Sequence, residues 1–375
     1  MAGLYVHIPF CRKACHYCDF HFVTSLAKRT EMIDAICKEI IDRKDELKQT
    51  PVETIYFGGG TPSVLLAKEL NRILDVIHQN YSVLPSIELT FEANPDDCSM
   101  NNLTMWKDAG INRLSIGVQS FNQADLDWMN RSHDSLQATQ AIDNANNAGF
   151  DAINLDLIYG VPSMSTETWH NNVKTALALS IDHISAYGLT VEKGTALHHF
   201  IKTEKYPKLK DEKAAEEFEY FHNEILTKGW EQYEISNYCK PGRYARHNTN
   251  YWKQKPYLGI GPSAHSYAEG RRRWNIANNT KYIKAINEGN EYFEVETLSR
   301  QDRINEHIML GLRTKWGIDL SETKKLFDYD LVNSNKKAID TFINKGQMTR
   351  NNSKLCLTTT GKLFADYIAS TLFVV

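Results

Sequence analysis

The fold of this chain is decided by one stretch near its start, Cys11-Arg12-Lys13-Ala14-Cys15-His16-Tyr17-Cys18. Three cysteines follow directly after Leu4-Tyr5-Val6-His7-Ile8, an alternating apolar run that predicts a strand ended by Pro9. The thiols are therefore expected on the loop at the end of that strand. Three thiolates on one loop can hold three irons of a cubane cluster, whereas a structural 4Fe-4S site uses four. One iron then keeps an open position for a substrate or cofactor, as catalytic zinc sites also do.

A disulfide and a structural zinc site are the simpler interpretations of these cysteines. Disulfides are disfavoured because the chain has seven cysteines, an odd number, and no secretory signal. A structural zinc site usually combines a CxxC pair with a distant second pair. The remaining cysteines are scattered and fit ordinary thiols, so the CxxxCxxC spacing favours an iron-sulfur cluster.

Composition sets the broad class of the protein. The 375 residues predict one domain of barrel size and a smaller one. The net charge of −3 makes nucleic acid an unfavoured partner. No apolar run reaches the ~18 residues of a membrane span, although peripheral membrane contact stays open. The first residues lead straight into a strand, which leaves no room for a signal peptide, and we expect a cytoplasmic protein.

Strand and helix patterns alternate along the first half of the chain. This alternation is typical of parallel strands joined by helical crossovers. Six units are too few for a closed eight-unit barrel and predict a partial (β/α)6 TIM-like barrel, whereas a flat doubly wound sheet would carry GxGxxG after its first strand. The predicted strands are residues 4–8, 54–57, 87–91, 113–118, 151–158 and 183–187, and the predicted helices are 25–47, 66–77, 101–109, 135–148 and 166–179.

The pattern changes after residue 193, and three domains are predicted. Residues 1–235 form the barrel, 236–290 an aromatic and glycine-rich connecting segment packed on it, and 291–375 a mostly helical C-terminal domain. Helical periodicity is present at 212–227, 304–312 and 336–345, and a hairpin followed by a helix is expected near 355–368.

Polar residues and glycines follow the predicted strands, where barrel enzymes place their chemistry. Glycines let a ligand approach the backbone, and carboxylates accept hydrogen bonds from ammonium or hydroxyl groups. Arginine can donate two parallel hydrogen bonds to a carboxylate. Tyr17 can lie against an adenine ring. The residues concerned are the three cysteines, Gly58-Gly59-Gly60-Thr61-Pro62, Glu92, Gln119 with Arg131 beyond it, and Asp156. Each alone is more often structural, and their shared placement favours one ligand site.

Five stretches together resemble the oxygen-independent coproporphyrinogen III oxidase-like family of the radical S-adenosylmethionine (SAM) superfamily. They are residues 5–11, 58–63, 117–121, 130–133 and 156–162. The resemblance implies a 4Fe-4S cluster on Cys11, Cys15 and Cys18. It also implies SAM contacts at Tyr5, Tyr17, Gly59, Gly60, Thr61, Glu92, Gln119, Arg131 and Asp156.

Two departures from that family resemble its heme chaperone group, the HemW type. Phe20 stands where the oxidase has a fourth cysteine, and little sequence precedes Tyr5, where the oxidase has a long arm. Residues 246–252 match the HNxxYW motif of that group and make His247 the heme-ligand candidate, since neutral imidazole is a common axial ligand. The alternative is that His247 only holds a loop. His265 is a second candidate.

Two functions of different classes follow from this resemblance. The first is a heme chaperone that holds a 4Fe-4S cluster and SAM, binds heme and passes it to an acceptor protein. The second is coproporphyrinogen III oxidase, which decarboxylates two propionates to vinyl groups by radical SAM chemistry and needs a reductant such as a flavodoxin or ferredoxin. A radical SAM enzyme with another substrate is a third, weaker hypothesis.

Overall fold

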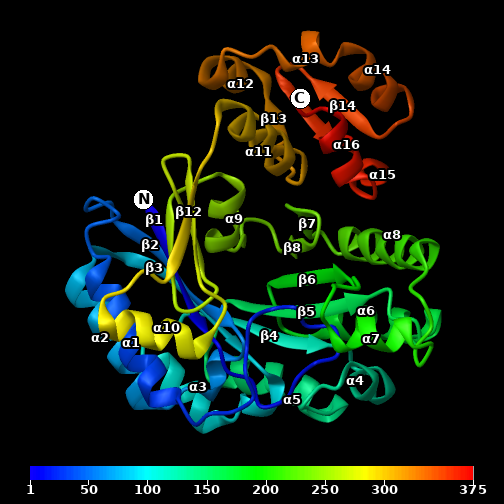
Figure 1. Ribbon diagram of the computed structural model, residues 1–375. Helices are drawn as coiled ribbons and strands as arrows, with labels where there is room; N and C mark the ends of the chain where they lie inside the picture. The colour runs from blue at the N-terminus through cyan, green and yellow to red at the C-terminus, as the bar shows by residue number, and fades with distance from the viewer. Residues whose placement is uncertain (375) are drawn as a thin grey trace.

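Six parallel strands form the centre of the protein. The computed structural model describes residues 1–374. In it, β1 to β6 lie side by side in sequence order and curve into an open barrel (Figure 1). The strands are β1 (Ala2–Ile8), β2 (Val52–Gly59), β3 (Val83–Ala93), β4 (Arg113–Gln119), β5 (Ile153–Tyr159) and β6 (His183–Gly188). The prediction of a partial barrel is therefore confirmed.

Helices cover the outer face of these strands. The Ser99 side chain caps α3 (Met100–Asp108) by accepting a hydrogen bond from the backbone N–H of Asn102, and Ser165 caps α6 (Thr166–Ala178) in the same way. The helix predicted over residues 25–47 is shorter in the structure, where α1 covers Arg29–Asp42. The helix α4 (Gln123–Met129) was not predicted, because so short a helix shows too little periodicity. The outer helices are α1 (Arg29–Asp42), α2 (Ala67–Asn80), α3 (Met100–Asp108), α4 (Gln123–Met129), α5 (Ser135–Asn147) and α6 (Thr166–Ala178), with the 3-10 turns η1 (Pro62–Val64) and η2 (Pro95–Asp97).

The inner face of the barrel is polar. Along β1, the fully buried Leu4, Val6 and Ile8 alternate with Tyr5 and His7, so the two sets face opposite sides of the sheet. Inner side chains of neighbouring strands bond to one another between β2 and β3, between β4 and β5, and between β5 and β6. A closed eight-stranded barrel fills the same space with branched apolar side chains. The polar lining suits an open barrel that holds a polar ligand.

The sheet extends beyond the barrel at both edges. β9 (Tyr257–Ile260) pairs in parallel with β1, and an antiparallel run of β10 (His265–Ala268), β11 (Arg271–Asn275) and β12 (Phe293–Thr297) follows. At the other edge, β8 (Asn237–Cys239) and β7 (Glu231–Gln232) follow β6. The segment 236–290, expected to be a connection packed on the barrel, thus contributes strands to the barrel's own sheet. It also forms α9 (Arg246–Trp252) and α10 (Asn279–Glu288).

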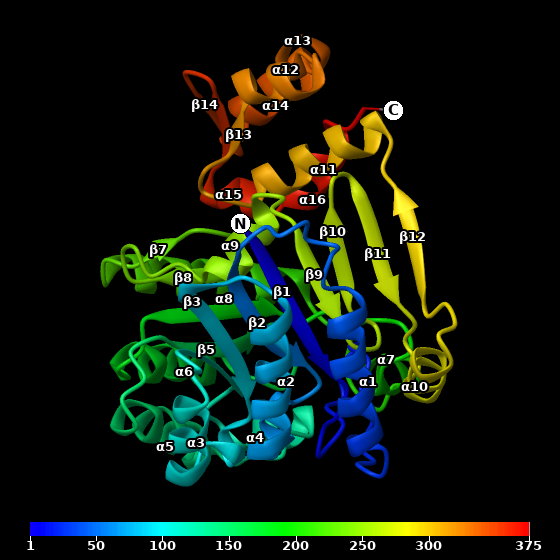
Figure 2. The ribbon, with the colours of Figure 1, turned by 90° about the vertical axis from the view of Figure 1, so that its left-hand side faces the viewer.

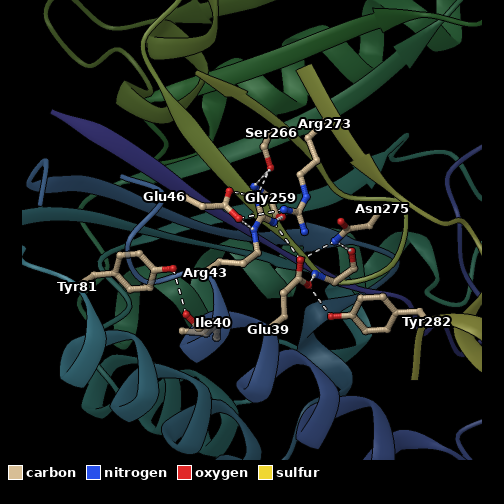
Figure 3. Close-up of polar contacts among 11 residues, drawn as sticks. Glu39, Ile40, Arg43, Glu46, Tyr81, Gly259, Ser266, Arg273, Asn275 and Tyr282 are labelled. Carbon is tan, nitrogen blue, oxygen red and sulfur yellow. Dashed lines mark hydrogen bonds and ion pairs between the residues drawn. The ribbon is translucent and has the colours of Figure 1, made fainter. Parts of the chain in front are cut away.

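A buried ion pair on α1 fastens this extension to the barrel. Arg43 donates to Glu39 at 2.9 Å and to the carbonyl of Gly259 on β9 at 2.7 Å (Figure 3). Glu39 also accepts from Tyr282 of α10 at 2.5 Å and from Asn275 of β11 at 2.8 Å. A buried charge is tolerated when its hydrogen bonds are satisfied, and here the partners come from three elements.

The C-terminal unit has a separate core and lies at the amino ends of the barrel strands. Figures 1 and 2 show it beside α9, at the opposite end from the loop that follows β1. Lys315 donates its backbone N–H to Tyr233 across this boundary. The predicted hairpin and following helix are confirmed. The unit contains α11 (Arg300–Leu312), β13 (Ile318–Asp319), α12 (Leu320–Phe327), α13 (Leu331–Ser334), α14 (Lys336–Asn344), β14 (Met348–Asn351), β15 (Lys354–Leu357), α15 (Thr359–Lys362) and α16 (Ala365–Thr371).

Two further helices, α7 (Ala196–Lys202) and α8 (Asp211–Thr227), connect β6 to β7. The prediction of a helix over 212–227 is confirmed by α8. Within residues 1–374, no helix combines the length and the apolar character needed to cross a bilayer.

Candidate functional site

A cavity of about 530 Å³ opens at the carboxyl ends of the barrel strands. The side chains around it come from the loop after β1 and from the ends of β2 to β6, which is where ligands bind in barrels. Every predicted cluster and SAM residue except Tyr5 lines this cavity, namely Cys11, Cys15, Cys18, Tyr17, Gly59, Gly60, Thr61, Glu92, Gln119, Arg131 and Asp156. Residues far apart in sequence therefore meet in one place.

The cysteine loop is held against the barrel by its backbone. The N–H of Cys11 donates to the carbonyl of Val23 at 3.0 Å, and that of His16 donates to Met129 at 3.1 Å. The hydroxyl of Thr61 lies 3.3 Å from the Cys11 sulfur. Burial raises the pKa of Cys11 to about 11 and that of Cys18 to about 12. Without metal these thiols are protonated at neutral pH, so iron binding must displace their protons.

The three cysteines do not converge on one point. All seven cysteines carry free thiols. Within residues 1–374, no group of three or more His, Cys, Asp or Glu side chains is close enough to hold a single metal ion. A mononuclear zinc site needs such convergence because all its ligands share one ion. In a cubane each thiolate binds a different iron, so the three thiols need not meet at one point.

Arg131 is half-buried beside the second cysteine. Its Nη1 lies 3.2 Å from the sulfur of Cys15, and its Nη2 donates to Asn94 Oδ1 at 2.9 Å and to the Gly117 carbonyl at 2.7 Å. The Nε atom is buried and has no hydrogen-bond partner among the described residues. Arg131 was predicted to donate two hydrogen bonds to a ligand carboxylate, but its Nη atoms already bond to Cys15, Asn94 and Gly117. The guanidinium places a positive charge beside the cysteine loop.

The glycine loop after β2 presents carbonyl groups rather than N–H groups. The N–H of Gly60 donates to Ile8 at 2.9 Å, and that of Thr61 donates to Phe10 at 2.7 Å. A Cβ at Gly60 would lie 2.6 Å from the Phe10 carbonyl oxygen, so only glycine fits there. Gly59 has φ +106°, which also favours glycine. Because its N–H groups bind the β1 loop, this loop is suited to an ammonium group and not to a carboxylate.

Two carboxyl groups face the cavity with raised pKa values. Burial raises the pKa of Glu92 to about 7, and the charge of Asp156 adds to the rise while the hydrogen bond from Tyr56 opposes it. The Tyr56 hydroxyl donates to Glu92 Oε1 at 2.6 Å. Burial raises the pKa of Asp156 to about 6 against the hydrogen bond from Asn154, which is 2.8 Å long. Two acids kept close in a buried site are suited to binding a cationic ligand that supplies the missing charge.

Tyr5 lies one layer deeper than predicted. Its hydroxyl is 3.2 Å from Nδ1 of His7, and its ring stacks on Tyr56 with centroids 6.0 Å apart. It therefore supports the cavity floor and does not line the cavity. Gln119 does line it, with a left-handed backbone at φ +69°. Tyr17 lines it as well, and burial raises the pKa of its phenol.

His247 is not exposed to the cavity or to solvent. Its side chain lies inside the barrel near the amino end of β2, only 2% exposed. Its Nδ1 is 2.8 Å from Thr54 Oγ1 and its Nε2 is 2.7 Å from the Tyr251 hydroxyl. Burial lowers its pKa to about 3, so the ring is neutral. Because both ring nitrogens are engaged, His247 cannot bind a heme iron in this conformation, and the alternative that it holds the local structure fits better.

His265 is exposed on β10, beside Trp274 at a ring distance of 6.2 Å. Burial and the charge of Arg272 lower its pKa, which keeps the imidazole neutral. Of the two histidines singled out in the sequence, His265 is the one that is free to bind a metal from outside.

Three supporting residues were missed by the sequence reasoning. Asn94 holds Arg131, Tyr56 holds Glu92, and Asn154 holds Asp156. Asn94 comes directly after β3, the strand that carries Glu92, so its position at the strand end could have marked it as a site residue. Tyr56 and Asn154 lie within strands, where an inward polar side chain cannot be told from an outward one without knowing which face is filled.

Comparison with known proteins supports this site. Residues 5–176 match the family model of the radical SAM superfamily, and residues 298–364 match that of the HemN C-terminal domain. The radical SAM superfamily implies a 4Fe-4S cluster and SAM. The residues present fit both groups, because three thiols share one loop at the cavity and Arg131 carries an unpartnered Nε.

Several known proteins are similar over nearly the whole chain. The structure of coproporphyrinogen III oxidase (HemN) from Escherichia coli superposes with a TM-score of 0.87 at 22% identity, covering 100% of this chain and 90% of that one, which shows the fold. The heme chaperone HemW of Bacillus subtilis is 33% identical over 98% of both chains. HemW of Haemophilus influenzae is 33% identical over 97% of this chain and 96% of its own. The chain therefore belongs to the HemW family of the radical SAM superfamily.

Proposed function

We propose that this protein is a heme chaperone of the cytoplasm. It holds a 4Fe-4S cluster on Cys11, Cys15 and Cys18, binds SAM beside the cluster, binds heme, and passes the heme to an acceptor protein. The observation that carries this proposal is the full-length similarity to curated heme chaperones. Phe20, 68% exposed at the cavity where the oxidase pattern has a fourth cysteine, supports it.

Different residues around the cavity bind different parts of SAM. The carbonyl groups of the glycine loop and the carboxylate of Glu92 accept hydrogen bonds from its ammonium group. Asp156 is placed to accept from ribose hydroxyls, and Tyr17 offers a ring face to the adenine. When bound, the reduced cluster supplies the electron with which radical SAM proteins cleave SAM.

His265 is the heme ligand in this proposal, replacing His247. An exposed neutral imidazole next to an aromatic ring is what an axial heme ligand requires, and His265 beside Trp274 has both features. Arg272 lies two residues before Trp274 on β11, on the same face of the sheet, and is ion-paired with Glu296 and Glu306. This part of the surface thus offers a ligand and a ring.

One anaerobic experiment tests the function. The reconstituted protein is given heme in one assay, and coproporphyrinogen III with SAM and a flavodoxin-type reductant in another. The proposal expects stoichiometric heme uptake that can be transferred to an apo-hemoprotein, and no protoporphyrinogen. Conversion of coproporphyrinogen would establish the oxidase function instead. Heme uptake that is lost in His265→Ala and kept in His247→Ala supports the assigned ligand, and the reverse result overturns it.

A further inference from the structure

We infer that His247 and Tyr56 are positioning residues for SAM binding, with His247 fixing Tyr56 and Tyr56 fixing the carboxylate of Glu92. The HNxxYW stretch then belongs to the floor of the SAM cavity and not to a heme site. The inference rests on the SAM site in the proposed function. It concerns residues that line no part of the cavity and act through Glu92, which does line it.

Tyr56 is the main support of Glu92. Its hydroxyl donates to Glu92 Oε1 at 2.6 Å, a short bond of the kind a carboxylate makes with a strong donor. Tyr56 lies on β2 and Glu92 on β3, so the bond joins two neighbouring strands. Loss of the hydroxyl would remove this bond and free the carboxylate to rotate away from the glycine loop.

His247 determines where the Tyr56 ring lies. The two rings stack with centroids 5.0 Å apart and planes inclined by 27°. Tyr5 stacks on the same phenol with centroids 6.0 Å apart. A ring that contacts partners on β1 and α9 has little freedom to swing, so its hydroxyl stays aimed at Glu92.

His247 itself is fixed by contacts on several sides. Its ring nitrogens lie close to Thr54 Oγ1 and to the Tyr251 hydroxyl, and its backbone N–H donates to Glu88 at 2.8 Å. A Cβ at Gly3 would lie 3.2 Å from its Cε1, so β1 packs directly against the ring. Such a ring cannot turn outward without breaking these contacts. The contacts explain why a histidine, a tyrosine and a strand glycine occur together here.

The chain offers a matched control for Tyr56. Tyr282 is a fully buried tyrosine, whereas Tyr56 is partly buried; the Tyr282 hydroxyl donates to Glu39 at 2.5 Å, in a network that is remote from the cavity (Figure 3). Tyr56→Phe and Tyr282→Phe remove the same kind of bond. A general loss of stability affects both variants, and a loss of SAM positioning affects Tyr56→Phe alone.

The test measures SAM dissociation constants by equilibrium dialysis on the anaerobically reconstituted protein, with melting temperature and heme stoichiometry on the same samples. We expect Tyr56→Phe to weaken SAM binding about tenfold, the usual range for a hydrogen bond to a charged group. Tyr282→Phe should bind SAM as the parent protein does. Both should take up heme normally, so that failure of the heme chaperone proposal would be seen separately. Unchanged SAM affinity in Tyr56→Phe overturns the inference.

His247→Ala and His247→Gln complete the design. The alanine variant should weaken SAM binding and keep heme binding, and the glutamine variant should recover part of the SAM affinity because its amide can still bond near Thr54 or Tyr251. If His247→Ala does not fold, His247→Gln and Tyr56→Phe alone decide the matter. Loss of heme with SAM affinity unchanged in His247→Gln would contradict the inference and return His247 to a heme role.

Discussion

Nη1 of Arg131 lies 3.2 Å from the sulfur of Cys15, so a half-buried positive charge lies directly beside the cysteine loop. The guanidinium is held in place by Asn94 and by the carbonyl of Gly117, and it cannot move away when the cysteine changes its ligation. A fixed cation next to a cluster stabilises its more negative, reduced state.

Arg131→Gln is therefore expected to lower the reduction potential of the cluster by on the order of 100 mV, the effect of one screened unit charge at a few ångströms. Redox titration followed by electron paramagnetic resonance measures it. Lys13→Gln is the control, because Lys13 lies within the same loop with an exposed side chain, so its charge is screened by solvent. Equal shifts in the two variants would show that burial of the arginine does not matter.

Much of the barrel could be predicted from the sequence. Its strands are regular apolar runs, and Gly110 and Gly149 end helices as expected, both with positive φ. The extension at β9 to β12 could not be predicted, because β9 pairs with β1 across about 250 residues and its strands are short. Local patterns carry little information on such distant pairing.

The cavity residues at strand ends were predictable, because parallel strands all point their carboxyl ends to one rim. The prediction failed for residues whose role depends on how deeply the side chain lies below the cavity. Tyr5 follows the same pattern as the others, yet lies below the cavity. His247 has the residue type of a metal ligand, and only its contacts with Thr54 and Tyr251 show that both nitrogens are taken. Burial of a single side chain is a property of the whole fold.

Arg43→Met is expected to destabilise the protein by about 3–5 kcal/mol, because it leaves the fully buried carboxylate of Glu39 without its charged partner. Urea unfolding, measured at the first transition, provides the value. Lys38→Met removes the partner of Asp42 on the same helix, where both side chains are nearly half exposed. That variant should lose about 1 kcal/mol or less. A similar loss in both variants would show that the buried network does not hold the sheet extension.

Glu92→Gln is expected to stabilise the metal-free protein, and more at pH 8 than at pH 5. The pKa of Glu92 is raised to about 7 in the folded protein, so between the unfolded pKa and pH 7 the folded state binds more protons than the unfolded state. Its contribution to stability is therefore lost as the pH rises through this range. The gain at pH 8 is at most about 3 kcal/mol, from the size of the pKa shift.

Thermal unfolding of parent and Glu92→Gln at the two pH values checks this sign. The same variant should lose SAM binding, because an amide cannot supply the negative charge that the ammonium group needs. A stabilisation that is equal at pH 5 and pH 8 would mean that the ionisation of Glu92 is not the cause.

The central claim is that Cys11, Cys15 and Cys18 hold one 4Fe-4S cluster at the mouth of the open barrel. Iron and acid-labile sulfide in the anaerobically reconstituted protein test it most directly, with Cys15→Ala beside the control Cys98→Ala, a buried thiol outside the loop. The account predicts about four irons and four sulfides per chain in the parent and in Cys98→Ala, and loss of most of both in a folded Cys15→Ala. A parent protein without iron and sulfide, or a Cys15→Ala variant that keeps the full amount, would contradict it.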